Sequence, residues 1–293
     1  MLEQQLLNAL TLGSVYALFA LGFTLVFGVL AVINLSHGAV FMAGSYAALV
    51  LVTRFDAPLW LALLGAALFS GVIGLLVDVL VLKPLRARNA PHLIPMIATI
   101  GVGIMLTSSA QGLFGAEIRR FPEEILPAAD FVIGDIHVRA LELSIVAIAF
   151  LLMAVLFTVL KRSQLGRALR AIAESPKAAC LLGINVEALF HVTSFAAAAL
   201  GGVAGVLIGL DFNAITPQMG QPILHKGIAV IILGGMGDIR GALIGGLFLG
   251  FAEVISKAYL SSQMGDAVAF GLLFLILLIR PSGLFGRVLE RKA

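Results

Sequence analysis

Two short polar breaks in an otherwise apolar sequence hold the side chains that could bind a polar solute. The break NLSHG at 34–38 brings an amide, a hydroxyl and an imidazole together, and the break GGMGDIRG at 234–241 combines glycines with one acid and one base. These groups supply hydrogen-bond donors and acceptors that apolar side chains lack. Inside a membrane, a helix breaks where protein or a watery cavity satisfies the freed backbone groups, so both breaks are candidate parts of a transport path.

Each break has a plainer interpretation beside the functional one. His37 is either a residue that lines or gates the path, or a histidine hydrogen-bonded across a tight turn at the membrane surface. Asp238 and Arg240 equally fit an ion pair at the membrane interface. Thr99 could line the path from the fourth apolar stretch, although a helical threonine can also bond to its own backbone. The candidates for the path are Asn34, Ser36, His37, Gly38, Gly44, Thr99, Gly234, Gly235, Gly237 and Asp238.

A third polar stretch, LGRALRAIAESPKAACLLGIN at 165–185, separates two long apolar segments. Ser163 predicts the N-cap of a first short helix, and Ser175 followed by Pro176 predicts the start of a second. Gly183 suits the left-handed residue that ends a helix. Two caps and a terminator predict a pair of short helices with a fixed shape rather than a flexible connector, and a fixed shape indicates a docking partner.

The first of these short helices is amphipathic, since Leu165, Leu169 and Ile172 recur at near-helical spacing. A stripe of this kind could lie on lipid headgroups, with the neighbouring arginines paired to phosphates. The alanines around the stripe contribute little membrane affinity and favour packing against protein instead. Cys180, the single cysteine of the chain, is expected to be a small packing residue.

The elements that position these polar stretches are expected to be membrane helices. Of the 293 residues, 60% are hydrophobic and 12% are charged, and the mean hydropathy is +1.09, whereas soluble domains are about half apolar and a quarter charged. The apolar runs are long and continuous, without the alternation of a membrane barrel. The expected fold is an all-α, polytopic helical membrane protein with about eight to nine transmembrane helices of about 20 residues, some of them broken or short.

Eight apolar stretches mark the expected crossings, and the seventh is interrupted by GGMGDIRG, which makes nine crossings if that stretch spans the membrane twice. The stretches lie at about 8–30, 38–53, 58–82, 92–113, 141–160, 188–210, 226–256 and 266–280. Helices rich in small residues follow both breaks, from Gly38 to Gly44 and from Gly241 to Gly250, which suggests an inverted internal repeat. The whole chain, 1–293, is expected to form a single transmembrane domain.

The distribution of charge predicts the orientation of the chain. Basic residues outnumber acidic ones in three segments, around 83–88, 161–187 and 280–292, whereas the segment 114–140 is net acidic. Because cytoplasmic loops carry an excess of lysine and arginine, the three basic segments are expected in the cytoplasm and 114–140 in the periplasm. The N-terminus is then periplasmic and the C-terminus cytoplasmic.

Few charges fall near the apolar stretches, and those that do are expected either to reach the membrane interface or to pair along their own helices. The expected pairs are Asp78 with the nearby Lys83, and Glu253 with Lys257 four residues on. No charge stands isolated in the middle of a stretch. A proton-coupled carrier usually contains a buried acid or a histidine relay, so this pattern argues against that class.

Three of the stretches quoted above resemble those of a known family. LGRALRAIAESPKAACLLGIN resembles the cytoplasmic coupling loop of ABC-importer permeases, specifically the LivH-type subunits for branched-chain amino acids. GFTLVFGVLAVINLSHGAVFMAGSY at 22–46 is similar to that family's TLIFGVLxxINxAHGxxxMLGAY signature, and VIILGGMGDIRGALIGG at 230–246 to its GGMGSxxGAxxGG signature. RPSGLFG at 280–286 is also typical of the family. Asp238 and Ile239 depart from the second signature, where the family more often has serine and a small or apolar residue.

The resemblance implies a permease subunit of an ATP-driven importer in the bacterial inner membrane. It implies a second homologous permease subunit, two cytoplasmic ATPase subunits, a periplasmic solute-binding protein and membrane lipid as partners, and no nucleic acid. ATP and Mg would be bound by the ATPase subunits. This chain has no G-x-x-x-x-G-K-[ST] phosphate loop, and it is expected to hold no cofactor or metal and not to be an enzyme.

In this family the coupling loop, here about 161–187, contacts the ATPase and passes its movement to the spans on either side. The segment between the fourth and fifth spans, about 114–140, would be the periplasmic loop. The residues that would contact the ATPase are Gly166, Arg167, Arg170, Ala171, Glu174, Ala178, Leu181, Gly183, Ile184 and Asn185.

The sequence leaves the solute open. Branched-chain, hydrophobic amino acids are what the resemblance implies by default, and relatives of the family carry other amino acids, urea, short amides or aromatic acids. A stand-alone secondary carrier, in which 165–185 is only a membrane-surface helix, is the alternative from a different class. ATP-dependent, vanadate-sensitive uptake distinguishes the two classes.

Overall fold

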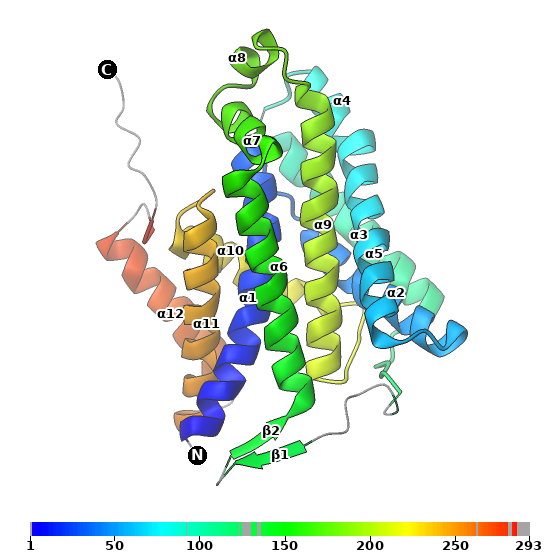
Figure 1. Cartoon of the computed structure of the whole chain (residues 1–293), viewed down its shortest axis with the longest axis vertical. Helices are drawn as coiled ribbons and strands as arrows, with labels where there is room; N and C mark the ends of the chain where they lie inside the picture. The colour runs from blue at the N-terminus through cyan, green and yellow to red at the C-terminus, as the bar shows by residue number, and fades with distance from the viewer. Residues whose placement is uncertain are drawn as a thin grey trace.

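The computed structural model describes residues 2–91, 93–122, 124, 130–133, 136–261, 263–280 and 283–285. Most of this part of the chain is helical, and the long helices stand side by side (Figure 1). The helices are α1 (Leu2–Leu30), α2 (His37–Phe55), α3 (Leu59–Val77), α4 (Lys83–Ala87), α5 (Leu93–Phe114), α6 (Ala140–Arg162), α7 (Gln164–Glu174), α8 (Pro176–Leu181), α9 (Val186–Asp211), α10 (Gly220–Gly234), α11 (Ile239–Tyr259) and α12 (Met264–Ile279). A π-helical turn, η1 (Asp78–Leu82), joins α3 to α4, and β1 (Asp130–Ile133) pairs with β2 (Ile136–Arg139).

Within the described residues, seven helices are long and apolar enough to cross a membrane. They are α1, α2, α3 with its continuation to Ala87, α5, α6, α9 and α11, and the shorter apolar helices α10 and α12 accompany them. The expected class, a polytopic helical membrane protein with short and broken helices, is confirmed. The hairpin between α5 and α6 is an element that the sequence did not signal, and the basic C-terminal stretch at 287–292 lies outside the described residues.

The helix α1 forms the centre of the bundle and is buried over most of its length. It packs against α6, α9, α10 and α11. Its contact with α11 depends on small residues: a Cβ on Gly13 would lie 3.0 Å from Leu247 Cα, and Gly246 lies against Ala17. In lipid, where apolar burial gives little driving force between helices, close backbone approach of this kind supplies the packing energy.

The interruption predicted at 234–241 is confirmed, because α10 and α11 are separate helices. Gly235 and Gly237 have φ angles of 100° and 88°, a region that glycine enters without the steric cost of a Cβ. Asp238 Oδ1 accepts a hydrogen bond from the backbone nitrogen of Arg240 at 2.8 Å and so caps α11. The ion pair expected between Asp238 and Arg240 is wrong, since the carboxylate binds the backbone instead.

The helices α2 and α10 both begin inside the bundle, and their first turns meet. A Cβ on Gly38 would lie 2.5 Å from the carbonyl oxygen of Gly220, so glycine is needed at this contact. The chain re-enters the bundle twice, through 31–36 after α1 and through 212–219 after α9. The first break, at 34–38, therefore packs on the start of α10 and not on the break at 234–241.

The two ends of the bundle differ. At one end, uppermost in Figure 1, α7 and α8 form a projection, which we call the knob (residues 163–185). The N-terminus and the β1–β2 hairpin lie at the other end (Figure 1), where Arg119 also pairs with Ile215. The basic segment 161–187 and the described residues of the acidic segment 114–140 thus lie at opposite ends of the bundle, as the charge distribution predicted.

Candidate coupling and translocation sites

The knob is built from the local signals in its sequence. Ser163 Oγ accepts a hydrogen bond from Gly166 N at 3.0 Å and begins α7, and Ser175 Oγ accepts one from Ala178 N at 3.3 Å and begins α8. Gly183 has a φ angle of 81°, as the predicted terminator requires. The two caps, the terminator and the two-helix shape are confirmed.

The apolar stripe of α7 faces the rest of the protein. Leu169 and Ile172 are buried in a cluster with Leu25 and Val29 of α1 and Leu160 of α6. Burial of two such side chains contributes about 1.5 to 3 kcal/mol each, which fixes α7 against the bundle. The alternative that these two residues lie on lipid headgroups is therefore wrong.

The outer face of the knob is apolar at its tip. Leu181 and Leu182, at the end of α8, are 90% and 79% exposed. Exposed apolar surface of this kind suits a contact with another protein or with a membrane. Cys180 beside them is also exposed and is not the packing residue that was expected. Leu181 was expected at the contact, whereas Leu182 was not, because the two leucines are consecutive and do not follow the helical spacing of an apolar stripe.

Most residues expected at the ATPase contact lie on the surface of the knob. Gly166 is buried at its base, and Ala171 and Ile184 are half-buried. The exposed members of the set are Arg167, Arg170, Glu174, Ala178, Leu181, Gly183 and Asn185.

Gly166 forms a tight joint between α6 and α7. A Cβ on Gly166 would lie 2.7 Å from Leu160 Cα. The variant Gly166→Ala is therefore expected to displace α7 and to lower the free energy of unfolding by about 1 to 3 kcal/mol, the usual cost of overpacking. Thermal unfolding of the purified chain measures this change. Gly112→Ala is the matched control, because no atom lies within 4 Å of a Cβ at that helical position; equal losses in the two variants would contradict the expectation.

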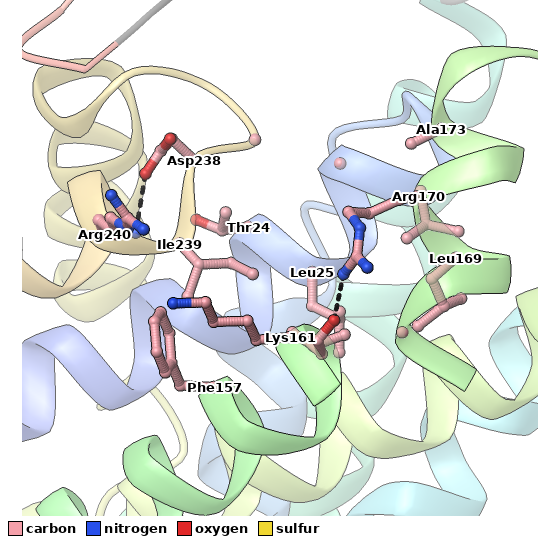
Figure 2. A pocket seen from close by; sticks show the side chains of 15 residues that line it. Thr24, Leu25, Phe157, Lys161, Leu169, Arg170, Ala173, Asp238, Ile239 and Arg240 are labelled. Atoms are coloured by element: carbon pink, nitrogen blue, oxygen red, sulfur yellow. Dashed lines mark hydrogen bonds between the residues drawn. The ribbon is translucent and has the colours of Figure 1, made fainter. Parts of the chain in front are cut away.

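The knob and the 234–241 break share a cavity of about 500 Å³ (Figure 2). Gly237 and Asp238, which were expected on the translocation path, face the same space as Gly166 and Arg170 of the knob. Its full lining is Thr24, Leu25, Gly28, Val29, Phe157, Leu160, Lys161, Gly166, Leu169, Arg170, Ala173, Gly237, Asp238, Ile239 and Arg240.

Two further path candidates, Gly234 and Gly235, lie in the turn beside this cavity. Gly234 packs directly on Gly241, the first glycine of α11. On α1, Gly22 lies beside His37, and Gly28 lies six residues further on, beside Gly237. At a rise of 1.5 Å per residue, the two sites are about 9 Å apart along the helix. The structure thus divides the path candidates between two places.

His37 lies in the centre of the bundle, 1% exposed. Its ring centroid is 4.7 Å from that of Phe19 and 5.5 Å from that of Phe23, and Gly22 and Gly201 leave the space that the imidazole fills. Among the described residues, its Nε2 has no hydrogen-bond partner. The alternative that His37 lies in a turn at the membrane surface is wrong.

Asn34, Ser36 and Thr99 are brought together beside His37. Asn34 Oδ1 accepts hydrogen bonds from Ser36 N at 3.1 Å and Ser36 Oγ at 2.6 Å. Thr99 Oγ1 accepts one from Leu35 N at 3.1 Å and donates to the Met96 carbonyl oxygen at 2.8 Å. Thr99 bonds to its own helix, as the plainer interpretation held, and at the same time it anchors the re-entrant segment 31–36 to α5.

Gly38 and Gly44 are contact residues of α2. Gly38 meets Gly220, and Gly44 packs on Gly202 of α9. The segment that carries Gly220, TPQMGQ at 216–221, was missed in the sequence analysis. Its signal was available, because a proline, a glycine and polar residues interrupt two apolar stretches there.

A buried ionic cluster joins four helices. The expected pair of Glu253 with Lys257 is confirmed at 2.6 Å, and the same carboxylate also accepts from Lys226 at 2.7 Å and from Tyr16 at 2.9 Å. Lys226 lies 3.0 Å from Asp266 as well. Lys226 was not among the charges expected to pair, because it stands at the edge of an apolar stretch. Buried charges between membrane helices persist where they are paired in this way.

A second ionic cluster joins the end of α3 to the first turns of α9. Asp78 is fully buried in η1 and lies 2.6 Å from both Arg86 Nη1 and His191 Nδ1. The expected pair of Asp78 with Lys83 is wrong: Lys83 lies 3.7 Å from Glu187 instead. Asp78 and Lys83 are five residues apart, not three or four, and the buried Asp78 carboxylate is already bound by Arg86 and His191.

The fold and these sites define the class of the protein. Long apolar helices, two re-entrant segments whose following helices begin inside the bundle, and polar groups gathered at those breaks are features of multi-pass membrane transport proteins. The family follows from comparison with known proteins. Residues 5–277 match the family described as branched-chain amino acid transport system / permease component, so the chain belongs to this family of permeases.

Individual relatives agree along most of the chain. BraD of Pseudomonas aeruginosa, a high-affinity branched-chain amino acid transport system permease protein, is 38% identical over 97% of this chain and 95% of its own length. LivH of Escherichia coli, with the same description, is 37% identical over the same shares. A probable branched-chain amino acid transport permease protein LivH of Methanocaldococcus jannaschii is 31% identical over 95% of this chain and 91% of its own. No solved structure matches the chain. The resemblance seen in the sequence is confirmed.

Proposed function

We propose that this chain is the permease subunit of an importer that uses ATP hydrolysis on partner subunits to carry branched-chain amino acids across the bacterial inner membrane. The names of the relatives supply the solute class. The observation that carries the proposal is the knob, a capped two-helix projection with two exposed leucines at its tip. A stand-alone carrier has no need of such a contact surface.

In this proposal the knob faces the cytoplasm and the hairpin end faces the periplasm. The excess of basic residues in 161–187 supports that orientation. The N-terminus is then periplasmic and the C-terminus cytoplasmic.

The partners are a second homologous permease, two ATPase subunits that bind ATP and Mg²⁺, and a periplasmic solute-binding protein. Residues 1–293 act as a single transmembrane domain and do no covalent chemistry themselves. In this proposal α5 contacts lipid or the second permease subunit, because most of its residues are exposed in this chain.

The knob passes movement to the polar breaks through α9. Closure of the ATPases on nucleotide displaces the knob, and with it α6 and α9, which flank it. Movement of α9 reaches the first break directly, since Gly201 touches the His37 imidazole and Gly205 packs on the Phe41 carbonyl. The polar side chains at 34–38 and the N-terminal ends of α2 and α10, which carry partial positive charge, are then the groups that meet a passing zwitterion.

Uptake into proteoliposomes tests the function. The chain reconstituted with its partner subunits is expected to take up leucine only with ATP inside and loaded binding protein outside, and vanadate is expected to stop the uptake. Leucine uptake driven by an ion gradient, with no ATPase subunit present, would overturn the proposal in favour of a secondary carrier. Tight binding of urea, an amide or an aromatic acid by the cognate binding protein, with no binding of leucine, would overturn the solute assignment alone.

A further inference from the structure

The cavity behind the knob is rich in cations. Lys161 of α6, Arg170 of α7 and Arg240 of α11 all line it, and within the described part of the chain none of them lies within 4.0 Å of a carboxylate. The one acid in the lining, Asp238, uses Oδ1 to cap α11. The cavity therefore offers three positive charges against one carboxylate that the helix end already binds.

Two of these cations are held in place. The Arg170 guanidinium donates to the Leu160 carbonyl oxygen, and the Lys161 ammonium lies 5.5 Å from the centre of the Phe157 ring. In Figure 2, Lys161 extends toward the Asp238–Arg240 turn, and Arg170 enters the cavity from the side of α7. Groups positioned before binding lose less conformational entropy when a ligand arrives.

Thr24 provides an independent indication of a missing polar ligand. Its side chain lines the cavity, it is 2% exposed, and its Oγ1 has no hydrogen-bond partner among the described residues. A buried hydroxyl without a partner destabilises the fold, because it has lost its hydrogen bonds to water. A ligand with acceptor oxygens in the cavity would satisfy this hydroxyl and the cations together.

The rest of the lining is apolar. Leu25 and Val29 of α1, Phe157 of α6, Leu169 of α7 and Ile239 of α11 form it, at the level where the apolar helices give way to the knob. Basic pockets between membrane helices at this depth bind the head groups of anionic lipids. Guanidinium and ammonium groups suit phosphate oxygens, and the apolar side chains suit the glycerol and first methylenes of a lipid.

We propose that this cavity binds the phosphate group of an anionic membrane lipid from the leaflet at the knob end of the bundle. The bound phosphate bridges Lys161 and Arg170 on one side and Arg240 on the other, so it joins the base of the knob to α1 and α11. The site shares Arg170 with the residues expected at the ATPase contact, but its test needs neither the ATPase nor the transported solute.

Binding of phosphatidylglycerol to the purified full-length chain tests the site, with phosphatidylcholine as the neutral comparison and inorganic phosphate as competitor. We expect Lys161→Gln and Arg240→Gln each to weaken phosphatidylglycerol binding about five-fold, from about 1 kcal/mol per cation. Thr24→Val should also weaken it, since valine keeps the shape and removes the hydroxyl. Arg162→Gln is the matched control, because Arg162 is exposed next to Lys161 and does not line the cavity; its binding should stay within two-fold.

The outcomes separate the sources of the phosphate. Selective loss of phosphatidylglycerol binding in the cavity variants supports the lipid site. If the unaltered chain binds inorganic phosphate but no lipid, and the cavity variants lose that binding, the phosphate site is supported and its ligand is a soluble anion. Equal losses in Arg162→Gln and the cavity variants, or equal binding of phosphatidylcholine, would overturn the proposal, because surface charge or bulk lipid would then explain the result. Size-exclusion profiles confirm that each variant is folded.

Discussion

Replacing Leu181 and Leu182 with aspartate is expected to abolish ATP-driven uptake while the chain still folds and inserts. Both leucines are almost fully exposed at the tip of α8, so their replacement removes no internal packing. At the proposed ATPase contact they would be buried apolar anchors, and loss of such an anchor costs 2 kcal/mol or more, about 30-fold in affinity for each. Co-purification of the ATPase with the permease and ATP-dependent leucine uptake measure the effect.

Two controls separate apolar contact from charge. Lys177→Asp changes the charge of α8 by the same amount as the double aspartate variant and leaves both leucines in place, so it should retain most of the uptake. Leu181→Ala with Leu182→Ala removes the apolar surface without adding charge and should lose it. Full ATPase binding and uptake by the double aspartate variant would show that the tip of the knob is not the contact.

The variant Glu253→Leu is expected to destabilise the chain by about 3 to 5 kcal/mol, the usual cost of breaking a buried ion pair. Glu253 is 1% exposed and its carboxylate binds Lys226, Lys257 and Tyr16. Without Glu253, Lys226 stays buried, and the one carboxylate left beside it is that of Asp266, whose side chain is largely exposed. Thermal unfolding of the purified chain in detergent measures the loss, which should appear as a lower midpoint.

A double variant distinguishes the lost pair from lost packing. Glu253→Leu combined with Lys226→Met removes both buried charges and should recover most of the stability, because replacing a buried pair by apolar residues is often neutral. Lys257→Met is the control, because Lys257 is a half-exposed partner of the same carboxylate. It should lower the free energy of unfolding by about 1 kcal/mol or less. If the double variant is as unstable as Glu253→Leu, the cost comes from the shape of the side chain and not from an unpaired charge.

Local chemistry in the sequence determined much of this protein. The continuous apolar runs required membrane helices, since lipid leaves backbone groups without other partners. Ser163, Ser175 and Gly183 set the two helices of the knob, because caps and left-handed glycines act within a few residues. The split between α10 and α11 was predictable for the same reason, from the glycines at 234–237.

The partners of buried groups depended on the tertiary structure. His37 could not be placed in the sequence, because its burial results from Phe19, Phe23 and the glycine at 201, which are distant along the chain. Ion pairs were predicted along single helices, yet Asp78 reached His191 of another helix.

The sequence by itself determined the class, the family signatures, the breaks at 34–38 and 234–241 and the shape of the knob, each of which is encoded in neighbouring residues. Only the tertiary structure decided that the break at 34–38 meets the start of α10, that the break at 234–241 shares a cavity with the knob, and that the tip of α8 is the surface left exposed. The physical reason is that a helix starts, ends and enters lipid according to how nearby residues satisfy the hydrogen bonds of its own backbone. The packing of one helix on another depends instead on the shapes of surfaces that are far apart in the chain.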